Sequence, residues 1–209
     1  MLFLDPGLLQ HGQVETQTVR AAPSIPPYIR HLLGDLDDIR LIAERFFGHI
    51  HRWLPFISKK RFYDLYLQPS FHTQPDVVLL LLALKLITTF PPVDSRSPCT
   101  ALFHAVKHFY VEAEGTLSIL VLQAGLLVSL YELGHGIYPA AFLSIGTCAR
   151  YAHALGINVN RMVPTRKVLT LVEVEERRRV WWTIIILDRF VYNQFSICPS
   201  ALLITTKDS

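Results

Sequence analysis

The sequence of 209 residues has little cysteine, little charge and no long uninterrupted apolar run. Its three cysteines, Cys99, Cys148 and Cys198, are about fifty residues apart, and no Cys-x-x-Cys pair occurs. This spacing is unsuited to a disulfide framework or to a zinc site built from these cysteines alone. It is typical of a protein from a reducing compartment.

Charged residues make up only 18% of the chain, against about 25% in an average soluble domain. Hydrophobic residues make up 51%, which excludes a disordered tail, a collagen and a charged coiled coil. The 20 basic and 17 acidic residues leave a net charge of +3 and form no dense basic tract, so composition alone does not require nucleic acid. So much apolar surface requires helices that are buried on most sides, or a surface that a partner covers.

Three apolar segments were considered as membrane-spanning helices: 77–87, 117–130 and 180–187. All are shorter than the roughly 20 residues that cross a bilayer, and polar residues such as Lys85 and Gln123 interrupt two of them. We interpret them as buried helices and expect no membrane partner. The apolar run at the N-terminus stops at Asp5, so no signal peptide is expected.

Apolar residues recur at helical spacing from residue 35 onward, and no strand pattern is convincing. Capping residues such as Ser97, prolines such as Pro75 and several glycines divide this part into about seven helices, with Gly134 and Gly156 as expected left-handed caps. The expected helices cover 35–52, 59–67, 75–88, 97–114, 117–133, 138–155 and 172–195. The predicted fold class is an all-α antiparallel helical array. Residues 1–34 hold scattered prolines and glycines without a period and are predicted to be a linker or flexible arm.

The last expected helix, 172–195, is apolar around most of its circumference, which predicts a central position in the fold. Its β-branched residues favour a strand by propensity, but the segment is too long for one strand. Glu175 and Arg179 also have the i,i+4 spacing of a helical ion pair.

A central position has consequences for three residues of this helix. Trp182 is expected to be buried, and its replacement by alanine to threaten folding. Asp188 and Arg189 are expected to lie near the core in ion pairs, because an unpaired buried charge is costly. Arg150 is a candidate partner for Asp188.

One group of residues has metal-binding spacing. His104, His108 and Glu112 stand at i, i+4 and i+8, which places them on one side of a helix. They point away from the expected buried stripe, and the His-Glu-x-x-His pattern is absent, so a solvated face is the favoured interpretation. The chain also lacks a Gly-x-Ser-x-Gly elbow and a phosphate-binding loop, and we expect no enzyme activity.

The basic triplet 177–179 allows two interpretations. It could form a phosphate-binding patch, or it could pair with the acidic residues just before it. Those residues, Glu173, Glu175 and Glu176, balance its charge, which favours an internal salt-bridge network.

Several ordered motifs resemble those of the fungal-specific transcription factor domain, the helical middle homology region of zinc binuclear cluster regulators. They are the segment 46–62 with Trp53 and Pro55, the Tyr-Glu-Leu-Gly-His-Gly segment 131–136 with Gly134, the segment 146–156 with Gly156, and the Glu-Glu-Arg-Arg-Arg-Val-Trp-Trp segment 175–182 followed by Leu-Asp-Arg at 187–189. The resemblance covers about residues 38–200 and marks nine residues as signature and architectural residues: Trp53, Pro55, Gly134, Gly156, Arg178, Trp181, Trp182, Asp188 and Arg189.

The resemblance implies the regulatory domain of a sequence-specific transcription factor that acts in the nucleus. In that family a separate six-cysteine cluster binds two zinc ions and reads DNA. This chain has no such cluster, so the resemblance implies no zinc or other cofactor here and contact with DNA only through a module absent from the chain. Transcriptional co-regulators or a second copy are the expected partners.

The resemblance further implies that residues 35–209 are the N-terminal part of the domain, because family members continue with more helices. The family's Gly-Arg-Pro turn is replaced here by Ile197, Cys198 and Pro199. We expect an incomplete domain, such as a truncated or cluster-less relative, that exposes an apolar face near 184–191 and self-associates. Two alternatives remain: a helical-repeat interaction scaffold unconnected with transcription, and a helical metal protein that uses His104, His108 and Glu112.

Overall fold

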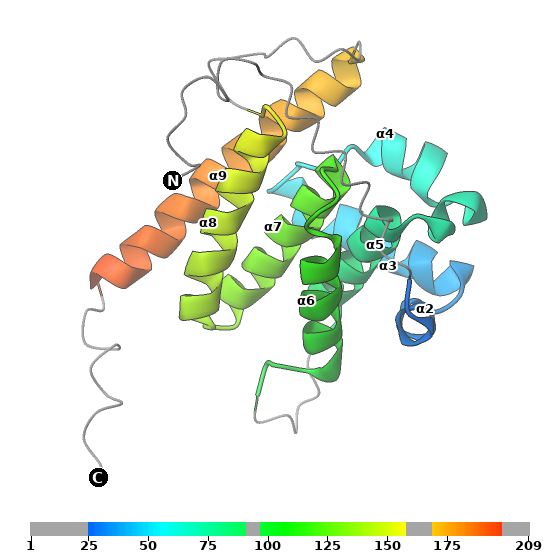
Figure 1. Ribbon diagram of the computed structural model, residues 1–209, viewed down its shortest axis with the longest axis horizontal. Coiled ribbons are helices and arrows are strands. Elements are labelled where there is room, and N and C mark those ends of the chain that lie inside the picture. The colour runs from blue at the N-terminus through cyan, green and yellow to red at the C-terminus, as the bar shows by residue number, and fades with distance from the viewer. Residues whose placement is uncertain (1–24, 91–96, 158–168, 198–209) are drawn as a thin grey trace, which may run out of the picture.

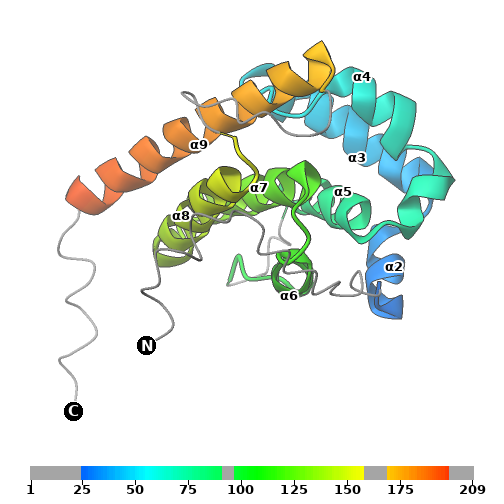
Figure 2. The same cartoon turned by 45° about the horizontal axis from the view of Figure 1, so that its top comes forward.

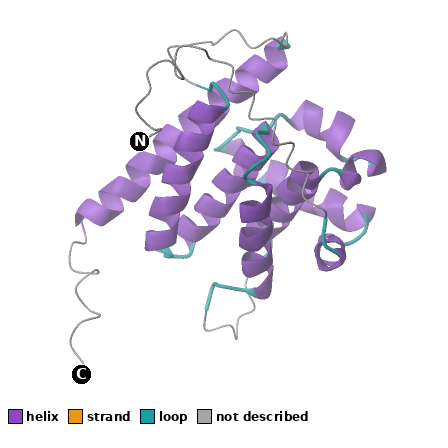
Figure 3. Cartoon of the chain, in the orientation of Figure 1, coloured by secondary structure: helices purple, strands orange, loops and turns teal. Residues whose placement is uncertain are grey.

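A computed structural model describes residues 25–90, 97–157 and 169–197, with side chains up to residue 193. Every regular element in these ranges is helical, and no strand occurs among them (Figure 3). The predicted all-α class is therefore confirmed. None of the helices in the described ranges combines the length and the apolar character that crossing a bilayer requires.

The helices follow the predicted order, with some differences at their ends. The elements are α2 (Pro27–Leu33), α3 (Leu36–Gly48), η2 (Ile50–Arg52), α4 (Lys59–Arg61), the π-helical turn η3 (Phe62–Tyr66), η4 (Pro69–Thr73), α5 (Pro75–Thr88), α6 (Ala101–Ala113), α7 (Ile119–Gly134), α8 (Tyr138–Ala154) and α9 (Leu171–Ile197). Helix α2 lies within the segment expected as a linker. Pro27 in its first turn favours a helix start, and Ile29 and Leu33, four residues apart, are buried.

Local capping explains the helix starts. Asp35 accepts hydrogen bonds from the backbone of Asp37 and Asp38 at 3.0 and 2.9 Å, which forms a capping box before α3. Helix α6 begins later than predicted, because Thr100 and not Ser97 caps it: the Thr100 hydroxyl accepts from the backbone of Phe103 at 3.2 Å.

The two predicted glycine caps have different outcomes. Gly156 has a φ of +67°, as expected for a left-handed cap after α8. Gly134 is the last residue of α7, and the left-handed conformation belongs to Gly136, with a φ of +73°. The left-handed cap was therefore predicted two residues too early. Helix α7 continues through Gly134, and His135 follows before the left-handed Gly136.

Helices α5 and α7 lie at the centre, with α3 and α6 packed on α5 and α8 packed on α7 (Figure 1). Helix α9 crosses this array, with its N-terminal end above α3 and α4 and its C-terminal end extending past α8 (Figure 2). The core is densest in α5, where the side chains from Val77 to Leu84 are all at most 1% exposed. Each such leucine or valine contributes about 1.5–3 kcal/mol of burial free energy.

Helix α9 is not the central helix that its composition predicted. One side is buried, through Val180, Ile184, Leu187 and Val191. Trp182, on the other side, is 50% exposed. The predicted burial of Trp182 is therefore wrong, because α9 lies at the edge of the array and has neighbours on one side.

Candidate functional site

The N-terminal half of α9 forms one wall of a pocket of about 370 Å³. The segment between η2 and α4 forms the opposite wall. The lining residues are His51, Pro55, Phe56, Ile57, Ser58, Lys59, Leu171, Val172, Glu175, Glu176 and Arg179. The segment 46–62 and the segment 175–182, two of the motifs singled out from the sequence, thus meet at this pocket.

Glu176 is the buried anchor of the pocket, with 3% of its surface exposed. Its carboxylate accepts a hydrogen bond from the backbone N–H of Ser58 at 2.9 Å and one from Gln123 Nε2 at 3.0 Å. It also forms an ion pair with the guanidinium of Arg61. A buried carboxylate is tolerated when it is paired and hydrogen-bonded, as here, and these bonds fix α9 to both α4 and α7.

Gln123 extends this network into α7. Its Nε2 also donates to the carbonyl of Phe56 at 3.0 Å, and Arg61 Nη2 lies 3.6 Å from Glu173 Oε1. The Oε1 atom of Gln123 is buried and makes no hydrogen bond with the described residues. The pocket wall is thus held by a polar network that connects three elements.

His51 lies on the other wall and is fixed by packing and by a backbone contact. Its Nε2 is 2.8 Å from the carbonyl oxygen of Ile57, and its ring packs against Phe46 and Phe47 at centroid distances of 6.1 and 5.0 Å. Burial lowers the pKa of His51, opposed by the hydrogen bond to Ile57. The lowered pKa favours the neutral imidazole, and the ring forms part of the pocket wall.

The basic triplet forms the favoured internal network only in part, because Arg178 and Arg179 pair with Glu175, whereas Glu173 and Glu176 pair with Arg61. Arg178 Nε and Arg179 Nε each donate to the Glu175 carboxylate at 2.8 Å. Hydrogen bonds from these two arginines lower the pKa of Glu175 to about 2. Arg177 Nη1 donates to the carbonyl of Leu155 at 3.1 Å and so satisfies the C-terminal end of α8.

Of the nine signature residues, Pro55 alone lines the pocket, and Arg178 pairs with Glu175 at its edge. The carbonyl of Pro55 accepts a long hydrogen bond of 3.5 Å from Arg179 Nη1. Trp181 is half-buried, with its ring edge-on to His153 at a centroid distance of 5.2 Å. Trp53 is 62% exposed and does not line the pocket. Gly134 and Gly156 end α7 and α8 and act only through the backbone.

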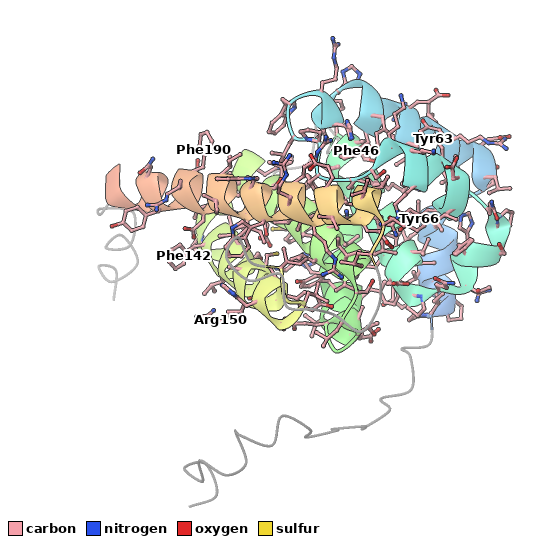
Figure 4. All side chains as sticks on the ribbon, turned by 90° about the horizontal axis from the view of Figure 1, so that it is seen from above. Phe46, Tyr63, Tyr66, Phe142, Arg150 and Phe190 are labelled. Carbon is pink, nitrogen blue, oxygen red and sulfur yellow. The ribbon has the colours of Figure 1, made fainter. Side chains whose placement is uncertain are left out.

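The expected burial of Asp188 and Arg189 is wrong. Both are exposed, and neither forms an ion pair within the described residues. Figure 4 places Arg150 along α8, well away from α9, so it does not pair with Asp188. Both charges lie on sides of α9 that face solvent, where no partner is needed.

The metal alternative receives no support from the geometry. His104, His108 and Glu112 are all exposed, and His108 Nδ1 lies 3.4 Å from Glu112 Oε1, as in a surface pair. In the ranges that the structure covers, no three His, Cys, Asp or Glu side chains gather as a metal site would require. Cys148 is fully buried in the core, and this burial raises the pKa of its thiol to about 12. Cys198 lies outside the described residues.

Sequence reasoning missed the buried polar residues of α7. Besides Gln123, Glu132 is fully buried and lies 2.9 Å from Lys107 Nζ, which also donates to Ser144 at 3.1 Å. The available signal was a polar side chain within an apolar segment, which indicates either exposure or a buried partner. The partner of Glu132 comes from α6, and those of Gln123 come from α9 and the segment before α4, so only the packed fold reveals them.

Comparisons with known proteins agree with the motifs that meet at the pocket. The family model described as "Fungal specific transcription factor domain" matches residues 43–208. The chain is 37% identical over 152 residues to "Transcription factor BOA15" of Botryotinia fuckeliana, a match that covers 71% of this chain and 84% of that protein. It is 24% identical over 165 residues to "Transcription factor tazR" of Aspergillus terreus, covering 72% of this chain and 25% of that protein.

No solved structure matches the chain. The family match begins within α3 and includes every described helix after it, together with the pocket and its anchor Glu176. The chain therefore belongs to the fungal-specific transcription factor domain family.

Proposed function

We propose that this chain acts in the nucleus as the regulatory domain of a fungal transcription regulator and contacts DNA only through a separate module. The observation that carries the proposal is the family match over residues 43–208. Two relatives named as transcription factors support it. Transcriptional co-regulators are the partners that this role requires.

The geometry supports a binding role over a chemical one. The buried polar residues around the pocket are engaged in holding elements together: Glu176 binds Ser58, Gln123 and Arg61. His51 and Ser58 both line the pocket, but His51 Nε2 contacts the carbonyl of Ile57 and the Ser58 hydroxyl accepts from the backbone of Arg61. A rigid helical body with a solvent-exposed outer helix is suited to receive another protein segment.

A tethering experiment tests the proposal. The full chain would be fused to a heterologous DNA-binding domain of known specificity and placed over a reporter gene in a fungal host. We expect reporter expression to rise or fall at least threefold relative to the DNA-binding domain alone. A fusion that carries Gly125→Val, which disrupts the packing of α7, is the matched control and should lose the effect. Expression equal to that of the DNA-binding domain alone would contradict the proposal and favour the interaction scaffold without a role in transcription.

DNA contact is tested separately with the unfused chain. In a gel-shift assay at physiological salt, we expect no sequence-selective binding of duplex DNA, because three scattered cysteines cannot form the six-cysteine cluster. Weak binding that disappears with added salt is compatible with the proposal, since it reflects net charge alone. Selective nanomolar binding would show that the chain itself reads DNA.

A further inference from the structure

Helix α9 carries a second apolar side that nothing in the described structure covers. Its residues stand at i, i+3, i+7, i+10, i+14 and i+18, which places them on one side of the helix. They are Val172, Glu175, Arg179, Trp182, Ile186 and Phe190, and we name this set the outer stripe. At 1.5 Å per residue the stripe is about 27 Å long.

The apolar members of the outer stripe are large and exposed. Trp182, Ile186 and Phe190 are 50%, 42% and 57% exposed, at consecutive i, i+4 positions. Figure 4 shows Phe190 projecting from the side of α9 that faces away from α8. A surface helix normally presents polar residues to solvent. A contiguous row of exposed large apolar side chains therefore marks a binding surface.

The charges beside the outer stripe are predominantly positive. Arg178 and Arg179 lie at its N-terminal half and share one acidic neighbour, Glu175. Arg189 lies beside Ile186 and Phe190 and has no ion pair within the described residues. Asp188 points nearly half a turn away from Ile186 and Phe190, since each residue advances about 100°. Three arginines thus accompany one glutamate along the stripe.

The outer stripe also leads into the pocket. Val172, Glu175 and Arg179 belong to both, and Lys59 adds a further positive charge on the opposite wall. The surface is therefore an apolar row with a basic border and a concave end of about 370 Å³. That combination fits a segment that is apolar on one side and acidic on its flanks.

We propose that the outer stripe of α9 docks an acidic amphipathic α-helix from a partner protein. The partner's apolar side packs on Trp182, Ile186 and Phe190, and its carboxylates face the arginines. A second copy of this chain is the less suitable occupant, because two outer stripes would bring arginines against arginines. The inference rests on the geometry and charge of α9, and it goes beyond the role in transcription without depending on it.

A synthetic helical peptide of about 20 residues tests the proposal, with leucine and phenylalanine on one side and glutamate on the flanks. Fluorescence anisotropy with the full chain should show saturable binding that weakens as salt is added. A control peptide with lysine in place of every glutamate should bind at least tenfold more weakly. Equal affinity for the two peptides, or no binding of either up to millimolar protein, would overturn the proposal.

Three variants of the chain locate the binding surface. Ile186→Glu should weaken acidic-peptide binding at least tenfold, and Arg189→Glu about fivefold. Leu143→Glu, at an exposed apolar position of α8, is the matched control and should leave binding unchanged. Thermal melting of each variant confirms that the fold is retained, as expected for exposed positions. Equal affinity of the Ile186→Glu variant and the unaltered chain would exclude the outer stripe.

Sedimentation of the chain without peptide tests whether a second copy of the chain occupies the outer stripe. We expect a monomer whose mass does not change with Ile186→Glu, in place of the self-association that the sequence predicted, because the arginines of two stripes would repel each other. A dimer that this substitution dissociates would assign the stripe to a second copy and overturn the proposal. Because all these measurements use purified protein and peptide, they remain informative even if the tethering experiment fails.

Discussion

Helices α7 and α9 both contain an apolar segment, yet the fold buries the two helices very differently. In α7, twelve of the sixteen residues are buried, polar ones included. In α9, burial follows one side, through Val180, Ile184, Leu187 and Val191. The difference arises from position in the array: α7 lies between α5 and α8, whereas α9 lies at the edge. Apolar composition alone therefore does not distinguish a central helix from an edge helix with a second binding side.

The largest expected effect is on the hydrogen bonds and the ion pair by which Glu176 joins α9 to α7 and α4. Glu176→Ala removes the partner of Gln123, Ser58 and Arg61. Because these groups are left unpaired in a buried site, the variant should lose about 3–5 kcal/mol of unfolding free energy. Urea unfolding measures this loss. Glu175→Ala, one residue earlier and at the surface, is the control and should change stability little, because surface ion pairs contribute little.

A smaller effect is expected at the closest packing point of α7. A Cβ atom at Gly125 would lie 2.7 Å from Tyr110 Oη and 2.9 Å from Cys148 Sγ. Gly125→Ala should therefore cost about 1–3 kcal/mol through overpacking, despite the better helix propensity of alanine. Gly146→Ala in α8 is the matched control, because its Cβ would meet nothing closer than 3.8 Å. That control should be neutral or stabilising, and equal melting temperatures of the two variants would contradict the close approach.

On the exposed side of α9, a substitution is expected to reduce the unfolding free energy by less again. Trp182→Ala should reduce the unfolding free energy by no more than about 1 kcal/mol, because half of the side chain already contacts solvent. Leu187→Ala, on the buried side of the same helix, should cost about 2–5 kcal/mol. Thermal unfolding of the two variants compares the sides directly. A larger loss for Trp182→Ala than for Leu187→Ala would mean that α9 is covered on its outer side in the isolated chain.

The smallest effect is the pH dependence of the exposed ion pairs. The pKa of Glu175 is lowered to about 2 by hydrogen bonds from Arg178 and Arg179. Its stabilising contribution is therefore complete above an unfolded pKa of about 4.3 and is lost as the pH falls through about 2. Solvent and salt screen a fully exposed pair, so the difference in stability between Glu175→Gln and the unaltered chain should be small at pH 6 and disappear near pH 2. A difference that grows on acidification would contradict this assignment.

The sequence predicted the helices well because their start and stop signals are local. Pro75 opens α5 and Gly156 ends α8 as expected, and the i,i+4 pair of Glu175 and Arg179 forms at 2.8 Å. Such features depend on neighbours within a few residues. The predicted capping of α6 by Ser97 failed because Thr100 offered a competing hydroxyl three residues later.

The long-range features could not be predicted in the same way. Glu176 was interpreted as a partner for the adjacent arginines, but its partners are Ser58, Arg61 and Gln123, more than fifty residues away. The burial of Trp182 was predicted because apolar residues surround most of α9. A helix with one buried and one exposed apolar side has the same distribution of apolar residues. Which side faces the core depends on the packing of α7 and α8, which periodicity within one helix does not contain.

The hydrogen bond between Ser58 and Glu176 spans 118 positions of the chain, and Arg61 and Glu176 are separated by 115. During synthesis the chain grows from its N-terminus, so α4 emerges long before its carboxylate partner exists. Arg61 therefore has no carboxylate partner from α9 until that helix has been made. Contacts of such separation carry a large loop-closure entropy and slow the final step of folding. The joining of α4 to α9 thus depends on one glutamate that is made 115 residues after its arginine partner.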